Sequence, residues 1–374
     1  MAIVSLRNVD NHVSRSHGYE FEDIIAEKLD NADIYAPRPG SLWPYLSKVR
    51  NRVSYRTKAV RALPTDLNSP SLERDYDILF YSVAQLRDLN VLDAVGNWRK
   101  RSNCAICWIQ ELWNHDFETL GTLVERLNDF DLVICSFADT TDTLRRRLGV
   151  PVRYIPWGVD AIAFCPLPNP PRRAIDVLSI GVRHEQTHAA LIDHADRTGQ
   201  YYSYETISGR AGMRDHRAHR HNYIGQLKRS RYFFSYLAKV ERTEERGPQT
   251  EFGLRYIEGL AVGAVILGTR IENDAFEKHL GWTDSVIPVP YACPDIGATI
   301  TAMDAQPERL ATIRRRNIAQ CLSRHDHLYR WQGLLDFAGL AGTPGMDQRK
   351  QQLDALIAQA QSEDIHEVGG ISSV

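Results

Sequence analysis

The sequence predicts an α/β protein built from two doubly wound, Rossmann-like domains that face each other across a cleft. Apolar runs alternate with helical patterns along residues 3–155, and the same alternation returns at 176–288. Strands that alternate with helices imply a parallel sheet covered on both faces. Between the two series, residues 156–171 contain five prolines, which is a linker composition. With 374 residues, the chain has the length of about two to three domains.

In the first half, short apolar runs predict strands, and apolar residues three and four positions apart predict helices. The predicted strands are 3–6, 76–83, 105–109, 131–136 and 152–155, and the predicted helices are 19–29, 86–95, 117–127 and 140–148.

The second half repeats this pattern after the proline-rich linker. Ligands of such sheets bind beyond the carboxyl ends of the strands, so we expect a site shared between the two halves. The predicted strands are 176–180, 232–237, 265–267 and 285–288, and the predicted helices are 187–196, 223–229 and 254–262.

The most informative stretch is 250–267, a polar loop followed by a short helix and an apolar strand. The backbone N–H groups of Phe252, Gly253, Leu254 and Arg255 stand at the helix start, where they can bind a phosphate. One turn later, the Glu258 carboxylate can accept hydrogen bonds from the hydroxyls of a ribose. After the helix, a glycine at 263 permits the tight turn into the buried strand. The stretch therefore predicts a nucleotide-sugar site.

This stretch resembles the donor-binding motif of the retaining GT-B glycosyltransferases of group 1, or family four. The match runs, in order and spacing, through Phe252-Gly253-Leu254, Glu258 and Ala261-Val262-Gly263. The family's first acid, which contacts the transferred sugar, falls on Thr250, and Glu251 follows one residue later. The resemblance implies that Glu251 takes this role from the adjacent position.

Other segments extend the resemblance. Residues 154–160 resemble the family's hinge element, 177–183 its first donor-domain strand, and 325–335 the closing helix of the CgeB-like branch. The resemblance implies a GT-B fold with an N-terminal acceptor-binding domain at 1–158 and a C-terminal nucleotide-sugar-binding domain at 159–325. It also implies helices at 326–374 that cross back to the first domain, before a tail that we expect to be disordered.

The resemblance also implies an activity. A hexosyltransferase-like enzyme would move a sugar from a nucleotide-diphosphate sugar to a hydroxyl of a glycan, a lipid-linked acceptor or a small molecule. It would use no metal and no cofactor besides the donor. Retention of configuration is implied, and inversion stays open.

Two cations follow strand ends where a diphosphate would lie. Arg183 comes just after Gly181, and a guanidinium binds phosphate bidentately while charge grows on the leaving diphosphate. Lys239 follows the strand at 232–237 and could neutralise the second phosphate. The alternative for both is a solvated loop cation.

Acceptor-side candidates lie in the first half. Glu111 and His115 follow the strand at 105–109 and so point toward the cleft. His12 and His17 lie after the first strand, and an inverting enzyme would need a base such as His17 for the acceptor hydroxyl. The alternative for either histidine is an ordinary hydrogen-bonded surface position.

The net charge and the positions of the cysteines indicate which partners and which cellular compartment to expect. The formal net charge of −2 predicts no nucleic acid partner. Six scattered cysteines suggest core positions and a reducing cytoplasm. The histidine-rich segment 215–221 is interpreted as a flexible basic loop, because its arginines would repel a metal ion.

Residues 41–63 predict a basic amphipathic helix with apolar residues on one face and no acid between its cations. Such a helix could make peripheral contact with anionic lipid at the inner face of a membrane. The alternative, favoured slightly, is a helix whose apolar face packs on the core and whose polar side is solvated.

Three rival functions remain. A nucleotide-sugar epimerase shares the fold, and a non-catalytic nucleotide-sugar-binding protein is compatible with the displaced first acid. A dinucleotide oxidoreductase is disfavoured because no Gly-x-Gly-x-x-Gly follows a strand.

Overall fold

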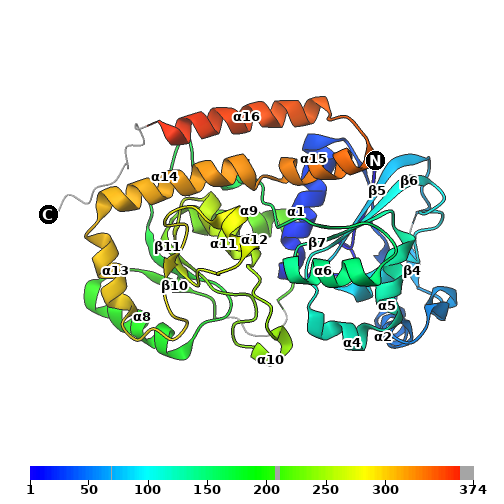
Figure 1. The fold of residues 1–374 in the computed structure, drawn as a ribbon, viewed down its shortest axis with the longest axis horizontal. Helices are drawn as coiled ribbons and strands as arrows, with labels where there is room; N and C mark the ends of the chain where they lie inside the picture. The colour runs from blue at the N-terminus through cyan, green and yellow to red at the C-terminus, as the bar shows by residue number, and fades with distance from the viewer. Residues whose placement is uncertain (69, 207–210, 363–374) are drawn as a thin grey trace.

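A computed structural model describes residues 1–68, 70–206 and 211–362 of the chain. Two α/β lobes lie side by side, and long C-terminal helices run along both of them (Figure 1). The predicted α/β class with two parallel-sheet, Rossmann-like units is confirmed. The tail predicted to be disordered, 363–374, lies outside the described residues.

The N-terminal lobe contains a six-stranded parallel sheet in the order β2-β1-β5-β6-β7-β8. Its central strands are buried on both faces, which explains why they are almost wholly apolar. The strands are β1 Ala2–Val4, β2 Asp33–Tyr35, β5 Tyr76–Val83, β6 Ser102–Ile109, β7 Leu132–Cys135 and β8 Val152–Tyr154; β3 Arg38–Pro39 and β4 Leu67–Asn68 form a separate antiparallel pair.

The C-terminal lobe contains a five-stranded parallel sheet in the order β10-β9-β11-β12-β13. Short β10 was not predicted, because three residues give too little periodic signal. The strands are β9 Ile175–Ser179, β10 Tyr202–Tyr204, β11 Ser230–Ser235, β12 Val265–Gly268 and β13 Ile287–Pro288.

Three helices of the N-terminal lobe, α3, α4 and α5, have only four residues each. The helix predicted at 117–127 is broken at Gly121 into two pieces. The helices are α1 Ser16–Ile24, continued by a π-helical turn at Ile25–Leu29, and α2 Trp43–Ser54, α3 Leu89–Leu92, α4 Phe117–Leu120, α5 Thr122–Glu125 and α6 Ala138–Arg147; 3-10 turns lie at Val13–Arg15, Lys58–Ala62, Leu86–Asp88, Asn114–Asp116 and Arg126–Asp129.

The favoured interpretation of 41–63 as a helix with its apolar face on the core is correct only in part. Helix α2 covers only part of the segment; Val60 beyond it is fully buried, but Val49 and the N-cap residue Leu42 are exposed while Arg50 is fully buried. Arg50 donates to Asp93 and to the carbonyl of Leu63, so an ion pair attaches this helix to the lobe.

The C-terminal lobe contributes the remaining helices. The interpretation of 215–221 as a flexible loop is wrong, because these residues begin α9 and its His216 and Arg217 both bind Asp23 of α1. The helices are α7 Ala161–Phe164, α8 Glu185–Thr198, α9 His216–Lys228, α10 Thr243–Arg246, α11 Leu254–Ala261, α12 Asp274–Leu280, α13 Ile296–Asp304, α14 Pro307–Arg324, α15 His327–Ala338 and α16 Pro344–Gln361.

Helices α14, α15 and α16 connect the lobes (Figure 1). The α15 residue Trp331 donates its indole N–H to Asp30 of the N-terminal lobe at 3.1 Å. The α16 N-cap residue Thr343 donates to the carbonyl of Leu29. Among the described residues, no helix combines the length and apolarity needed to cross a bilayer.

Candidate functional site

The strand order predicts where a ligand binds in the C-terminal lobe. Strand β9 has β10 on one side and β11 on the other, so successive connections leave it in opposite directions. In doubly wound sheets, ligands bind beyond the strand ends at this switch point. Arg183 follows β9 and Lys239 follows β11, so both cations predicted from sequence stand at the switch point.

Two guanidinium groups lie at Gly181, just beyond the end of β9. Gly181 has a φ of +85°, and a Cβ placed on it would lie 2.6 Å from Nη2 of Arg255. Nη1 of Arg183 lies 3.5 Å from the Gly181 carbonyl oxygen. Neither arginine forms an ion pair within the described residues. The Glu205 carboxylate accepts from the backbone N–H of Gly181 at 3.2 Å, without forming an ion pair with either arginine. Two guanidinium groups and one carboxylate therefore lie at this position.

Helix α11 brings the donor motif to the same place. Gly253 is its N-cap and Leu254 its first residue, so the first N–H groups lack intrahelical acceptors. Phe252 instead points its ring into the core, 6.1 Å from the ring of Phe276. Gly263 ends the helix with a φ of +69°, where a Cβ would lie 2.9 Å from Ile318.

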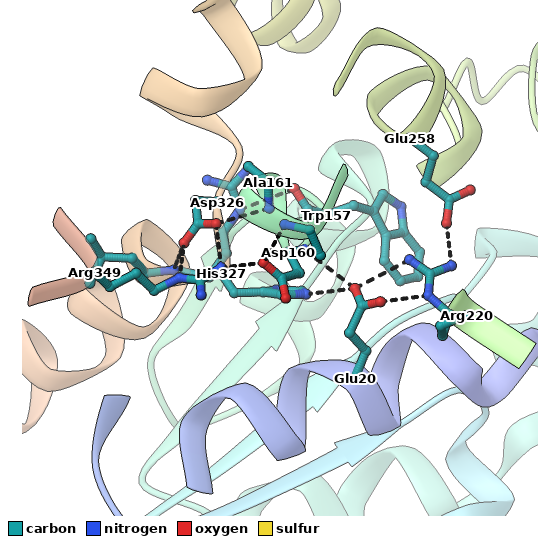
Figure 2. A network of polar contacts seen from close by, with 12 residues as sticks. Glu20, Trp157, Asp160, Ala161, Arg220, Glu258, Asp326, His327 and Arg349 are labelled. Carbon is teal, nitrogen blue, oxygen red and sulfur yellow. Dashed lines mark hydrogen bonds and ion pairs between the residues drawn. The ribbon is translucent and has the colours of Figure 1, made fainter. Parts of the chain in front are cut away.

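Glu258 is buried on α11, and protein groups bind both of its oxygens; Figure 2 shows the contact with Arg220. Its Oε1 accepts from Nη1 of Arg220 at 2.6 Å, and its Oε2 accepts from the Tyr223 hydroxyl at 2.8 Å. Each carboxylate oxygen can accept a second hydrogen bond. Glu258 is thus held in one orientation while retaining acceptor capacity for a ribose.

Arg220 joins Glu258 to the other lobe. Its Nε donates to Glu20 of α1 at 2.7 Å, so one guanidinium binds a carboxylate from each lobe (Figure 2). Burial alone would raise the pKa of Glu20, but the charge and hydrogen bonds of Arg220 outweigh it and hold that pKa far below its ordinary value. Burial alone would lower the pKa of Arg220, but the two carboxylates outweigh burial and raise that pKa above its ordinary value.

A second buried ion cluster fastens the linker to the C-terminal helices (Figure 2). Asp326 accepts from the backbone N–H of Ala161 at 2.9 Å and from Arg349 of α16 at 2.7 Å. Arg349 also donates to Asp160 at 2.7 Å. His327, next to Asp326, lies 3.4 Å from Glu20, so this cluster adjoins the Arg220 bridge.

The side chain of Lys239 points toward the N-terminal lobe. Its Nζ lies 4.7 Å from the ring centroid of Trp113 and 3.0 Å from Glu245. The indole of Trp113 donates to Glu111 at 2.7 Å, which places Glu111 and Lys239 on the same tryptophan. His115 lies nearby in the chain and is exposed. The structure therefore brings Glu111 and Lys239 together.

Glu251 caps a helix of the opposite lobe. Its carboxylate accepts from the backbone N–H groups of Ala138 at 3.2 Å and Asp139 at 3.1 Å, at the start of α6. The α6 N-cap residue provides no side-chain cap of its own. Burial, and secondarily the charge of Asp139, raise the pKa of Glu251 to about 7. Its contact with a sugar stays a prediction.

Replacing Glu251 with glutamine is expected to change how stability depends on pH. The pKa of Glu251 is about 7 in the folded protein, above its ordinary value of 4.5. The stability that this side chain contributes to the wild-type protein is therefore greatest below pH 4.5 and is lost as pH rises through 7. The variant should therefore gain about 2 to 3 kcal/mol relative to wild type between pH 5 and pH 8. Urea unfolding of the wild type and the variant at pH 5 and at pH 8 measures this difference in the free energy of unfolding. Glu308→Gln, an exposed control, should show no such change, and an equal difference at both pH values would contradict the assignment.

The predicted histidines lie at different positions. His17 is in the first turn of α1, with its ring centroid 5.0 Å from that of Trp157 in the linker. Burial, and then the charge of Arg220, lower the pKa of His17 to about 3, so its imidazole is neutral at neutral pH. His12 instead forms a β-bridge with Gly212 of the other lobe. A role as base stays a prediction for His17.

Sequence reasoning missed three residues that organise this site. Arg220 and Tyr223 orient Glu258, and Gln249 accepts from the N–H of Asn114 at 2.6 Å across the lobes. The only sequence signal was for Arg220, in the histidine- and arginine-rich segment 215–221. Nothing in the sequence pairs residues so far apart.

A cavity of about 570 Å³ lies away from this site, at the amino ends of β6, β7 and β8. Two of its arginines, Arg61 and Arg99, are paired with Asp129 and Asp131. Amino ends of parallel strands are not where ligands of such sheets bind. We assign the site instead to the switch point. The described residues contain no group of three or more His, Cys, Asp or Glu that could hold a metal ion.

Comparison with known proteins places this geometry in a fold family. No protein-family model and no curated protein matches the sequence. An alpha-glucosyltransferase in complex with UDP and a 13-mer DNA containing an HMU base is similar in structure, with a TM-score of 0.54, 10% identity, and coverage of 90% of this chain and 98% of that chain. The complex of alpha-glucosyltransferase with UDP-glucose and DNA containing an abasic site has a TM-score of 0.51, 9% identity and the same coverage. The chain has the GT-B fold.

One prediction is corrected by these structures. We expected no nucleic acid partner from the net charge of −2, but the similar alpha-glucosyltransferase is in complex with DNA. The exclusion was wrong because net charge averages over the whole surface, whereas binding depends on where the cations lie. Net charge therefore does not exclude a nucleic acid for this fold.

Proposed function

We propose that this protein is a glycosyltransferase that moves a sugar from a nucleotide-diphosphate donor to an acceptor hydroxyl. The observation that carries the proposal is the pair of guanidinium groups at Gly181, which have no carboxylate partner among the described residues. They stand at the switch point of a parallel sheet beside the amino end of α11. Such a position suits a diphosphate.

Each residue would have a defined part in the reaction. The bond between the anomeric carbon and the β-phosphate oxygen breaks, and its electrons leave with the diphosphate. Arg183 and Arg255 would stabilise that growing charge, while Glu258 would hold the ribose. The acceptor oxygen forms the new bond to the anomeric carbon, and its proton passes to an oxygen of the departing diphosphate. Lys239 would add positive charge from the loop after β11.

The fold neighbours support further detail. They are complexes with UDP or UDP-glucose, which supports uridine diphosphate as the nucleotide part of the donor. We propose that the donor binds to residues 159–325 and the acceptor to 1–158, near Glu111, His115 and His17. The acceptor is a hydroxyl of a glycan, a lipid-linked molecule, a small molecule or a modified nucleic acid. We propose transfer with retention and without a metal, which an anomeric NMR assignment and a chelator-treated assay would test.

Replacing Glu258 with glutamine is expected to weaken UDP binding about 10- to 100-fold, the range for a lost charge-assisted hydrogen bond. Titration calorimetry with UDP measures the affinity. Glu22→Gln provides a matched control, because Glu22 is also a buried carboxylate but binds Ser5 and Arg7 within its own lobe. Unchanged UDP affinity in the Glu258 variant would refute the assigned ribose contact.

Product analysis separates the proposal from its rivals. A glycosyltransferase releases UDP from UDP-sugar in step with sugar on the acceptor. Conversion of the nucleotide sugar without any acceptor would support an epimerase. Nucleotide binding without hydrolysis or transfer would support a binding protein.

A further inference from the structure

Helix α2 presents apolar side chains to solvent. Leu42, Tyr45 and Val49 are 58%, 71% and 53% exposed, and they are three of the seven large apolar side chains exposed in the described part of the chain. Their spacing of three and four residues places them on one face of the helix. An apolar face of this kind indicates a surface that another phase or molecule covers.

Cations lie along the same face. Arg52 continues the helical spacing, Lys48 lies one residue before Val49, and Arg56 follows in the turn after the helix. Helix α2 itself contains no acidic residue. The ion pairs recorded around this segment use Arg50, Lys58 and Arg61, so within the described residues Lys48, Arg52 and Arg56 have none. The exposed face thus combines apolar side chains with unneutralised positive charge.

The opposite face explains how the helix keeps this orientation. Arg50 is fully buried against Asp93, and Asn90 donates to Asn51 at 2.8 Å and to Ser54 at 3.1 Å. Polar contacts therefore help to fix α2 to the lobe, with Tyr45 and Val49 outside, while Trp43 packs against the core. A water-exposed helix normally has the reverse arrangement.

We propose that the exposed face of α2 together with the residues at its two ends, formed by Leu42, Tyr45, Val49, Lys48, Arg52 and Arg56, binds the surface of an anionic lipid bilayer. Apolar side chains enter the headgroup region while neighbouring cations attract acidic lipids. A second copy of the chain fits less well, because the cations of two such faces would repel each other. A nucleic acid would use the cations but has no need of exposed Leu42 and Val49. The inference does not depend on the proposed enzymatic activity.

Vesicle co-sedimentation of the full chain tests this surface. We expect binding to vesicles of phosphatidylglycerol and phosphatidylcholine, weaker binding to phosphatidylcholine alone, and loss of binding as salt rises. Leu42→Gln with Val49→Gln should lower the partition coefficient about tenfold or more, and Lys48→Gln with Arg52→Gln about fivefold per cation. These exposed positions should leave the melting temperature unchanged.

Matched replacements on another helix provide the control. Ile192→Gln and Arg197→Gln change exposed residues of α8 and should leave vesicle binding as in wild type. Failure to bind anionic vesicles would overturn the proposal. So would equal binding by the α2 and α8 variants, or α2-dependent binding to duplex DNA without binding to vesicles.

Discussion

Replacing Arg220 with alanine is expected to lower the free energy of unfolding by about 3 to 5 kcal/mol, the range for breaking a buried ion pair from one side. Arg220 is only 6% exposed, and it donates to Glu20 at 2.7 Å and to Glu258 at 2.6 Å. Without it, two shielded carboxylates lose their shared cation. Urea unfolding of both proteins at neutral pH measures the loss.

The pH dependence of this loss is also predicted. The pKa of Glu20 lies below its ordinary 4.5 in the folded protein, so the ionised form contributes stability above that value. This contribution disappears as pH falls through the folded pKa. The deficit of the Arg220 variant should therefore be largest above about pH 5 and should shrink in acid.

Arg217 provides the control for Arg220. It lies on the same helix and binds Asp23 and Glu27, but its side chain is 56% exposed. Its replacement with alanine should cost no more than about 1 kcal/mol. Equal losses in the two variants would mean that the guanidinium between the lobes has no special contribution to stability.

Replacing Arg183 with alanine is expected to lower kcat about 10²- to 10³-fold. This is the range seen in other enzymes when one group that stabilises the charge of the transition state is removed. Charge on the departing diphosphate grows as the sugar bond breaks, so the effect should fall on kcat more than on KM. Arg183 is partly exposed and has no ion pair within the described residues, so folding should be unaffected. Steady-state kinetics with UDP-sugar and acceptor measure both constants.

The variant Arg183→Lys refines the test. It keeps the charge but lacks the bidentate fork, so its kcat should lie between those of wild type and alanine. Arg197→Ala, on the exposed side of α8, should retain wild-type kinetics. A change in KM alone for Arg183→Ala would remove it from transition-state stabilisation and leave it as a binding residue.

Residues at or beside the candidate donor site also form contacts between the two lobes. Glu251 of the donor loop caps α6, Gln249 binds the N–H of Asn114, and Arg220 binds a carboxylate of each lobe. The residues predicted to bind the donor and the residues that hold the lobes together therefore lie in the same short segments of the chain. Separation of the lobes would release the cap on α6 and the bridge at Glu258 together.

Much of the fold could be predicted because its signals are local. The strand at 76–83 coincides with β5, and the helix at 254–262 with α11, since apolar runs and helical spacing depend only on neighbours in sequence. Gly263 was predicted at a tight turn, and its positive φ is the conformation that glycine adopts without strain. Strand β10 and the broken helix after β6 were missed because such short elements depend on packing.

By itself, the sequence determined the two α/β units, their parallel sheets, and the positions of Arg183 and Glu258 at a strand end and on a helix. Only the tertiary structure decided what those residues touch. Arg255 reaches Gly181, Arg220 links Glu20 to Glu258, and α2 buries an arginine while exposing Tyr45 and Val49. The physical reason is that hydrophobic periodicity is written in adjacent residues, whereas a charge carries no mark of its partner. Glu20 and Arg220 are 200 positions apart, and only folding brings them together.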